Sequence, residues 1–249
     1  MGSNRNDDDS DGPTDIHRID VDGPVAIIGD IHGRADLLAK LLKKLGKHMP
    51  VFFVGDLIDR GPDSFDVVER LMARGARGIR GNHEEWMRRW CDGRGFHDDV
   101  LQRAFGALST LDSYGLKPGE PWAPRFVDVP PAHRRFFREL PLVLDLHVSG
   151  TPYWVIHAGV HKRTPVEPGL AVDEVVPWLV EYEPWDLLWN GGHIEDARRL
   201  DRLVVFGHTP HMKPAATPRA IAVDTGCGLW ESGALTAVVL PEGRFVSVS

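Results

Sequence analysis

Short apolar segments recur along the chain, and five of them run directly into side chains that bind metal ions. These segments are 25–28, 51–54, 78–79, 153–156 and 204–206, and the side chains that follow them are Asp30, His32, Asp56, Asn82, His157 and His208. Short β-rich apolar runs that end in glycine and a polar residue are typical of buried strands. Because parallel strands direct their C-terminal ends to one side of a sheet, the pattern predicts a single crevice lined by these six residues.

The first three strand ends are evenly spaced. Asp30, Asp56 and Asn82 follow one another at intervals of 26 residues, the length of a compact βα unit. Amphipathic helix patterns fill the two intervals, over 37–45 and 65–71. The first third of the chain therefore predicts the order β-α-β-α-β.

The remainder of the chain predicts a helical insertion and a second set of strands. Residues 84–140 are rich in Trp, Arg and Phe, which indicates helices over one edge of the crevice, with a Pro/Gly-rich loop at 117–131. Strand patterns then return at 142–148, 151–156, 203–206, 220–223, 234–240 and 244–248. We expect an α/β fold in which a two-sheet β-sandwich is flanked by helices, with the metal site at the C-terminal ends of strands.

The composition is that of one soluble globular domain. The chain has 249 residues, 42% hydrophobic and 26% charged, and no apolar stretch approaches the roughly 18 residues of a membrane span. Residues 1–22 are rich in aspartate and lack a signal-peptide core, so we expect an acidic, disordered tail before a single domain over 23–249. Two cysteines are too few for a disulfide framework, which favours the cytoplasm.

The net charge narrows the class of partner. At −7, the overall field repels nucleic acid and anionic membrane surfaces, so neither is expected as a partner. An anionic substrate would need a local cluster of arginines. The sequence leaves the oligomeric state open.

The predicted ligand set favours a pair of transition-metal ions. Carboxylate, imidazole and amide ligands together suit Mn, Fe, Zn or Co better than Mg or Ca, which prefer oxygen alone. Asp30 and His32 lie two residues apart and could hold one ion, Asp56 could bridge two ions, and Asn82, His157 and His208 would complete the second. A water that bridges such a pair becomes hydroxide near neutral pH and can attack phosphorus.

Five ordered blocks resemble the calcineurin-like metallophosphoesterases, and most closely their bacterial serine/threonine phosphatases of the phosphoprotein phosphatase type. The blocks are Gly29-Asp30-Ile31-His32-Gly33, Gly55-Asp56-Leu57-Ile58-Asp59-Arg60-Gly61, Arg80-Gly81-Asn82-His83-Glu84, His157-Ala158-Gly159-Val160 and Gly207-His208-Thr209-Pro210. The resemblance implies the four-layer fold of that superfamily. It also implies two metal ions, usually manganese or an iron- or zinc-containing pair, with Asp30, His32 and Asp56 on the first ion and Asp56, Asn82, His157 and His208 on the second.

The resemblance further implies catalytic roles beside the ligands. His83 matches the general acid of the family, Asp59 the carboxylate that orients it, and Arg60 an arginine that clamps the phosphoryl oxygens. Asn82 is also expected to contact substrate. Without the other blocks, Asp59-Arg60-Gly61-Pro62 could equally be a solvated turn and Asn82-His83 a structural pair.

One expected residue is missing from the family pattern. A second phosphate-binding arginine usually follows the Leu-Leu-Trp segment, yet here Trp189 is followed by Asn190-Gly191-Gly192-His193. Arg163 is our candidate replacement, with Arg198 or Arg199 as alternatives. The eight tryptophans, Trp189 among them, are expected mainly to pack the core and the insertion, with base stacking as the alternative.

Three functions remain open at this point. The first is a phosphomonoesterase that acts on phosphorylated proteins, peptides or small phosphoesters. The alternative is a symmetrical dinucleoside polyphosphate hydrolase of the diadenosine tetraphosphate type, and Asp59 and Glu84 favour the first over it. The third is a phosphate-binding scaffold without turnover, which the presence of all six ligands and His83 argues against.

Overall fold

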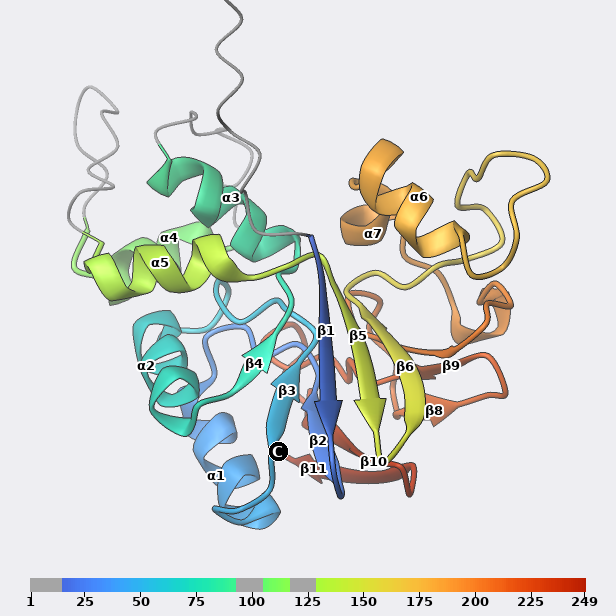
Figure 1. Ribbon diagram of the computed structural model, residues 1–249. Helices are drawn as coiled ribbons and strands as arrows, with labels where there is room; N and C mark the ends of the chain where they lie inside the picture. Colours follow the sequence, from blue (N-terminus) through green and yellow to red (C-terminus); the bar gives the residue numbers. More distant parts are fainter. Residues whose placement is uncertain (1–14, 93–104, 117–128) are drawn as a thin grey trace, which may run out of the picture.

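Two β-sheets face one another in the computed structural model, which describes residues 15–92, 105–116 and 129–249. One sheet has the order β1-β5-β6-β7-β9-β8, and its strands are β1 (Ile16–Val21), β5 (Val143–Val148), β6 (Thr151–Ile156), β7 (Leu203–Phe206), β9 (Ala220–Ala222) and β8 (Ala215–Ala216). The other has the order β11-β10-β2-β3-β4, with β11 (Arg244–Val248), β10 (Leu235–Leu240), β2 (Val25–Ile28), β3 (Val51–Phe53) and β4 (Arg77–Gly78). In Figure 1 the strands of both sheets lie below the helices α3–α7.

The five-stranded sheet is buried on both faces, which explains its uninterrupted apolar strands. Ala26 and Ile28 of β2 pack with helices α1 (Ala35–Leu45) and α2 (Ser64–Arg74), whereas Val25 and Ile27 point into the layer between the sheets. Strands β2, β3 and β4 are parallel, and β10 joins them antiparallel as half of the expected terminal hairpin with β11. Strands buried on both faces read as continuous apolar runs.

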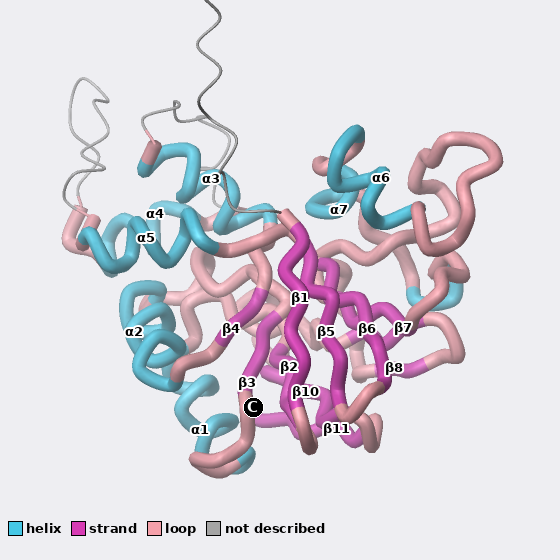
Figure 2. Tube along the Cα trace, in the orientation of Figure 1, coloured by secondary structure: helices cyan, strands magenta, loops and turns pink. Residues whose placement is uncertain are grey.

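The six-stranded sheet is built in the same way. Its inner face contributes Leu144, Val155 and Val205 to the core between the sheets, and its outer face packs against α6 (Val175–Tyr182) and α7 (Asp186–Trp189). Figure 2 shows the layers as helices, two groups of strands, and helices again. The expected fold, two sheets flanked by helices, is confirmed.

Three helices lie within the expected insertion: α3 (Asn82–Cys91), α4 (Ala107–Ser113) and α5 (Pro131–Glu139). Most of the expected loop at 117–131 lies outside the described residues. None of the described helices has the length and apolar character needed to cross a membrane.

The ordered fold begins earlier than the sequence suggested. Residues 16–21, which we assigned to the acidic tail 1–22, form β1 and pair in parallel with β5. The side chain of Asp15 forms an ion pair with Arg80, at 2.7 Å between Oδ1 and Nη2, and its carbonyl accepts hydrogen bonds from the backbone of Leu142 and Val143. The boundary at residue 22 was therefore wrong for these residues, while residues 1–14 lie outside the described part.

Candidate metal centre

The ends of strands from both sheets meet at one buried site. Asp30 and His32 follow β2, Asp56 follows β3 and Asn82 begins α3 after β4, while His157 and His208 follow β6 and β7 of the other sheet. Of the six described non-glycine residues with positive φ, five belong to this region: His32, Asp56, Asp59, Arg60 and His208. Such backbone strain is concentrated at functional sites, where the surrounding structure holds it in place.

One group of side chains gathers around His32 and Asp56. Nε2 of His32 lies 3.6 Å from Oδ2 of Asp56 and 4.0 Å from Oδ2 of Asp30. Nδ1 of the same ring lies 3.0 Å from the carbonyl of Ile58, so the tautomer with a proton on Nδ1 leaves Nε2 free to bind a cation. His32, Asp56 and His83 form a group that could hold a metal ion, and the predicted ligand Asp30 is not a member of this group.

A second group surrounds the other oxygen of Asp56. Nε2 of His157 lies 3.3 Å from Oδ1 of Asp56 and 2.9 Å from Oδ1 of Asn82. Nδ1 of His208 lies 3.1 Å from the same Asn82 oxygen and 3.2 Å from Nε2 of His157. Asp56, His157 and His208 form the second group that could hold a metal ion, so Asp56 is shared between the two.

The donor atoms of these groups fit cations well. Nδ1 of His157 lies 2.9 Å from the carbonyl of Val54, which orients the ring as the carbonyl of Ile58 orients His32. Nε2 of His157 and Nδ1 of His208 then face each other and an amide oxygen. Three acceptor atoms so close together repel one another unless a proton or a metal ion lies between them. The arrangement of nitrogen and oxygen donors suits transition-metal ions.

The protonation states of the rings favour metal binding. Burial lowers the pKa of His32 and of His157, and burial together with His157 lowers the pKa of His208 to about 4. These rings are therefore neutral near pH 7, which is the form that coordinates metals. Burial would raise the pKa of Asp56, but the surrounding histidines outweigh it and lower this pKa, which keeps the shared carboxylate ionised.

His83, a member of the first group, is held by a buried carboxylate. Its Nδ1 donates to Oδ2 of Asp59 at 2.6 Å, and its Nε2 lies 3.7 Å from Oδ2 of Asp56. Asp59 is fully buried and also accepts hydrogen bonds from Trp86 Nε1 and the Thr110 hydroxyl. Burial would lower the pKa of His83, but the charges of Asp56 and Asp59 outweigh it and raise that pKa. The ring therefore keeps its proton to higher pH than an ordinary histidine.

Glu84 fixes the backbone that carries Asp56. Its Oε2 accepts hydrogen bonds from the backbone N–H groups of Asp56 and Gly81, at 2.7 and 2.9 Å, and its Oε1 accepts one from Leu57 at 2.8 Å. Burial and the charge of Asp56 raise the pKa of Glu84 to about 7. Because Glu84 contacts backbone groups, a glutamate at this position stabilises the conformation of the loop after β3. It is a weak guide to the substrate.

Asp224 is a further buried carboxyl group that the sequence reading did not single out. It follows β9, accepts a hydrogen bond from the Gly226 N–H at 2.8 Å and pairs with the side chain of Asp30. Burial raises the pKa of both carboxyl groups, that of Asp224 to about 6. Its position at the end of another strand of the site was the available signal. Gly207 allows this crowding, because a Cβ there would lie 2.0 Å from Oδ1 of Asp30.

The arginines are placed unequally. Arg60 directs its guanidinium to Nε2 of His32, within the first group, and its buried Nε has no hydrogen-bond partner in the described structure. Arg163 is exposed, and no described contact links it to the site. The Arg198 guanidinium donates to the carbonyls of Lys162 and Thr164, and Arg199 is exposed. None of these three candidates is brought to the site by the contacts of the described residues.

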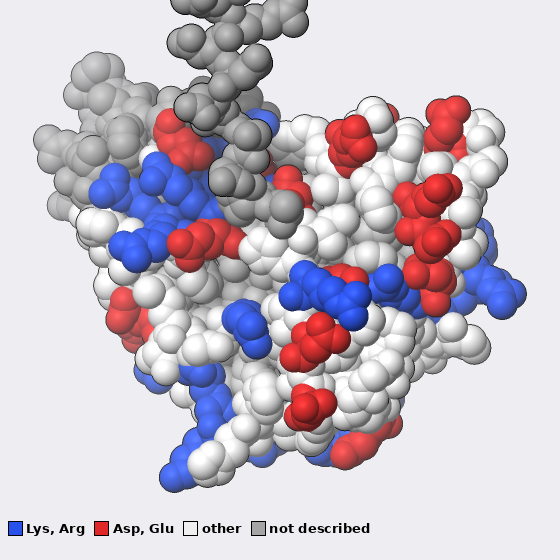
Figure 3. Space-filling model, in the orientation of Figure 1, with Lys and Arg blue, Asp and Glu red and all other residues white. Residues whose placement is uncertain are grey.

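Basic and acidic side chains gather in different regions of the surface, although the net charge of the protein is −7. Figure 3 shows basic side chains gathered over α5, and acidic side chains over α6 and the loop before it. The basic side chains of α5 are Arg134, Arg135 and Arg138. An anionic substrate therefore meets a less repulsive field on the side of the helical insertion.

Comparisons with known proteins agree with this geometry. A family model described as calcineurin-like phosphoesterase matches residues 23–232. The asymmetrical bis(5'-nucleosyl)-tetraphosphatase PrpE of Halalkalibacterium halodurans is 30% identical, over 89% of this chain and 92% of that protein. Serine/threonine-protein phosphatase 1 of Salmonella typhimurium is 25% identical, over 81% and 86%. A crystal structure provisionally described as a diadenosine tetraphosphatase superposes with a TM-score of 0.60 at 25% identity, over 94% and 96%.

The family match covers most of the chain, including every strand end that carries a predicted ligand. Members of this family use divalent metal ions, and the two buried groups around Asp56 could hold such ions. Sequence blocks, fold and site geometry thus lead to the same conclusion. The chain belongs to the calcineurin-like phosphoesterase family and is a metallophosphoesterase.

Proposed function

We propose that this protein hydrolyses dinucleoside polyphosphates, with diadenosine tetraphosphate as the representative substrate. The observation that carries the hydrolytic chemistry is the position of His83, which is held by Asp59 and faces Asp56, the residue shared by the two groups. The substrate class is supported by relatives that match about nine tenths of the chain and are named tetraphosphatases. These comparisons favour our alternative over the protein phosphatase that the sequence first suggested.

The proposed cleavage is asymmetrical. We expected a symmetrical enzyme if the substrate were a dinucleoside polyphosphate, but the matched relatives are named as asymmetrical enzymes. Asymmetrical hydrolysis of diadenosine tetraphosphate gives ATP and AMP, whereas symmetrical hydrolysis gives two molecules of ADP. The products therefore distinguish the two reactions.

The proposed ligand roles are those that the sequence resemblance implied, and the side chains gathered around Asp56 support them. Asp30, His32 and Asp56 hold one ion, and Asp56, Asn82, His157 and His208 hold the other, with manganese as the proposed metal. Two such ions supply Lewis acidity toward the phosphoryl group and activate water as a nucleophile near neutral pH. A side-chain hydrogen bond from Asp224 helps to position the carboxyl group of Asp30.

The remaining residues handle the proton and the charge of the phosphoryl group. His83 protonates the leaving oxygen from Nε2, while Asp59 holds Nδ1 and keeps the ring oriented. Arg60 binds phosphoryl oxygens, since its guanidinium already lies within the ligand group. Arg163 remains a proposed accessory contact, although it would have to move toward the site to serve as one.

A protein phosphatase activity is the second candidate. The similarity to serine/threonine-protein phosphatase 1 supports it. We expect manganese-loaded protein to show a higher kcat/KM for diadenosine tetraphosphate than for a phosphoserine peptide. The reverse order would favour the protein phosphatase, and no turnover of either substrate would favour a binding protein.

We also propose a cytoplasmic location for the protein. The free, buried thiols of Cys91 and Cys227 agree with this location.

A further inference from the structure

Trp189 is a large aromatic side chain that remains half exposed at the edge of the metal centre. It is the last residue of α7. The side chains of Leu187 and Leu188 in the same helix are buried, with exposed fractions of 0% and 3%, whereas Trp189 is 47% exposed. The two leucines therefore anchor the helix to the core without help from the indole. Packing of the core, which we expected for most tryptophans, does not account for this one.

A row of aromatic rings connects Trp189 to the acid of the site. The Trp189 and Phe105 rings lie 6.1 Å apart between centroids, with 34° between their planes. Phe105 in turn stacks on His83 at 4.0 Å and 20°. Trp189 also lies edge-on to His208, at 6.1 Å. One exposed indole thus contacts a proposed ligand, His208, directly and reaches the proposed general acid through Phe105.

The backbone after Trp189 holds the indole in this place. A Cβ on Gly191 would lie 2.4 Å from Oγ1 of Thr209 and 2.7 Å from Cδ2 of His208, so glycine lets the loop pack directly on the His208 ring. The Trp189 backbone also forms a hydrogen bond with His208. That contact belongs to the main chain, so a change of the Trp189 side chain leaves it in place.

We propose that Trp189 and Phe105 form a shelf on which a nucleobase of the substrate stacks. This inference rests on the proposed function and deepens it. Because His83 protonates the leaving oxygen, the nucleotide that departs extends along the face where Phe105 stacks on His83. Aromatic side chains bind bases through their π faces, which every base has. The shelf therefore recognises a purine or pyrimidine ring rather than a particular edge pattern.

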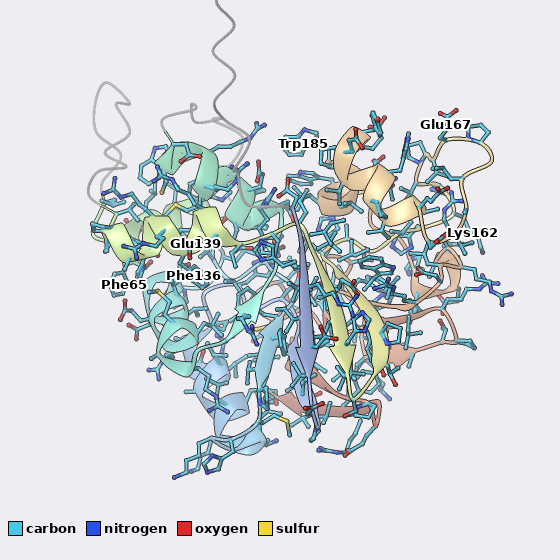
Figure 4. All side chains as sticks on the ribbon, viewed as in Figure 1. Phe65, Phe136, Glu139, Lys162, Glu167 and Trp185 are labelled. Carbon is cyan, nitrogen blue, oxygen red and sulfur yellow. The ribbon has the colours of Figure 1, made fainter. Side chains whose placement is uncertain are left out.

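Trp185 provides a matched control. It lies on the same segment, is also 47% exposed and stacks with the guanidinium of Arg89, 4.8 Å from the ring. In Figure 4 its side chain lies between α6 and α3, above the strands. Among the described ring contacts, none joins Trp185 to His83 or His208. Loss of Trp185 removes an equally exposed indole beside α7 without touching the shelf.

The test compares a substrate with bases to a ligand without them. In manganese-loaded full-length protein, KM is measured for diadenosine tetraphosphate, and Ki for inorganic tripolyphosphate as an inhibitor of that hydrolysis. Because a base gains binding energy by stacking on an aromatic side chain, we expect Trp189→Leu to raise the ratio of KM to Ki by about tenfold, which corresponds to about 1.4 kcal/mol. Trp189→Phe, which keeps a π face, should restore most of the wild-type ratio, and Trp185→Ala should leave it unchanged.

The outcomes separate the two proposals. If wild-type protein hydrolyses diadenosine tetraphosphate but Trp189→Leu and Trp185→Ala give the same ratio, the shelf is wrong and the proposed function stands. An equal rise of KM and Ki in Trp189→Leu would also overturn the shelf, because it would show a general loss of site structure. If wild-type protein does not hydrolyse the dinucleotide, the proposed function itself fails.

Discussion

At the scale of single residues, the proposed role of His83 as general acid is the most specific. Its Nδ1 is bound to Asp59 and its Nε2 faces the shared carboxylate of Asp56, so one ring nitrogen is held while the other is available for substrate. Asp59 keeps its hydrogen bonds from Trp86 and Thr110 when the ring is removed. The surroundings can therefore tolerate replacement of the imidazole.

We expect His83→Asn to lower kcat for diadenosine tetraphosphate by about 100-fold to 10,000-fold, the usual contribution of general acid catalysis. Metal content per chain should stay at the wild-type level. His133 is the control, since it is also buried and lies 2.6 Å from a carboxylate oxygen, that of Glu69, away from the site. Equal losses of kcat in His83→Asn and His133→Asn would show that the effect is structural.

The raised pKa of His83 predicts the alkaline side of the pH profile. The acid must be protonated, so kcat/KM falls as the pH rises through this pKa. The charge of Asp59 helps to raise the pKa, and Asp59→Asn should therefore shift the alkaline fall to lower pH. A pH profile of kcat/KM for both proteins measures the shift. A fall that stays at the same pH would assign it to another group.

The sequence predicted the ligand residues because each follows a strand pattern and carries a metal-binding atom. It did not identify Asp224, although this residue also follows a strand, because a single aspartate before Thr225-Gly226 resembles a turn. The roles of Phe105 and Trp189 depend on ring contacts between segments far apart in the chain. Such contacts leave no spacing pattern in the sequence.

At the scale of elements, Glu84 joins the start of α3 to the loop after β3. Its carboxylate accepts from three backbone groups at 2.7–2.9 Å, and glutamine offers only one acceptor oxygen in the same place. We expect Glu84→Gln to lower the free energy of unfolding of the metal-free protein by about 2 kcal/mol, since a buried donor is left unsatisfied. Denaturant unfolding measures this loss.

The exposed Glu139 provides the control for that substitution. Glu139→Gln should change the free energy of unfolding by less than about 0.5 kcal/mol. If Glu84→Gln were as mild as Glu139→Gln, the clamp on the Asp56 loop would contribute nothing measurable.

Most strands could be predicted from their apolar runs, but β1 could not. Its apolar residues alternate with His17, Arg18 and Asp20 in a segment whose composition is acidic, so the local pattern resembled the preceding tail. What stabilises β1 is its pairing with β5, more than 120 residues further along the chain. Strand pairing at that distance is a tertiary effect.

Two truncations test the boundary of the fold. A chain that begins at Asp15 keeps β1 and the ion pair with Arg80, and should unfold at the wild-type denaturant concentration. A chain that begins at Gly23 lacks Ile16, Ile19 and Val21, three half-buried side chains. It should lose about 3 kcal/mol of stability. Equal unfolding midpoints for the two chains would show that β1 is dispensable.

At the scale of the whole molecule, the site lies where two halves of the fold meet. Figure 1 shows α3, α4 and α5 on one side of the strand ends, and α6 and α7 on the other. The two sides contribute different parts: His83 lies in the first turn of α3 and Phe105 shortly before α4, while Trp189 ends α7 and His208 follows β7. In the proposed shelf, specificity for the substrate depends on how the two sides of the site face each other, which neither sequence segment determines alone.

The identity of the products tests the central claim most directly. Manganese-loaded protein is incubated with diadenosine tetraphosphate, and the nucleotides are separated by ion-exchange chromatography. We predict equal amounts of ATP and AMP, formed only with the metal present and lost in His83→Asn. Two molecules of ADP per substrate would contradict the asymmetrical reaction, and unchanged substrate beside rapid hydrolysis of a phosphopeptide would contradict the assignment to dinucleoside polyphosphates.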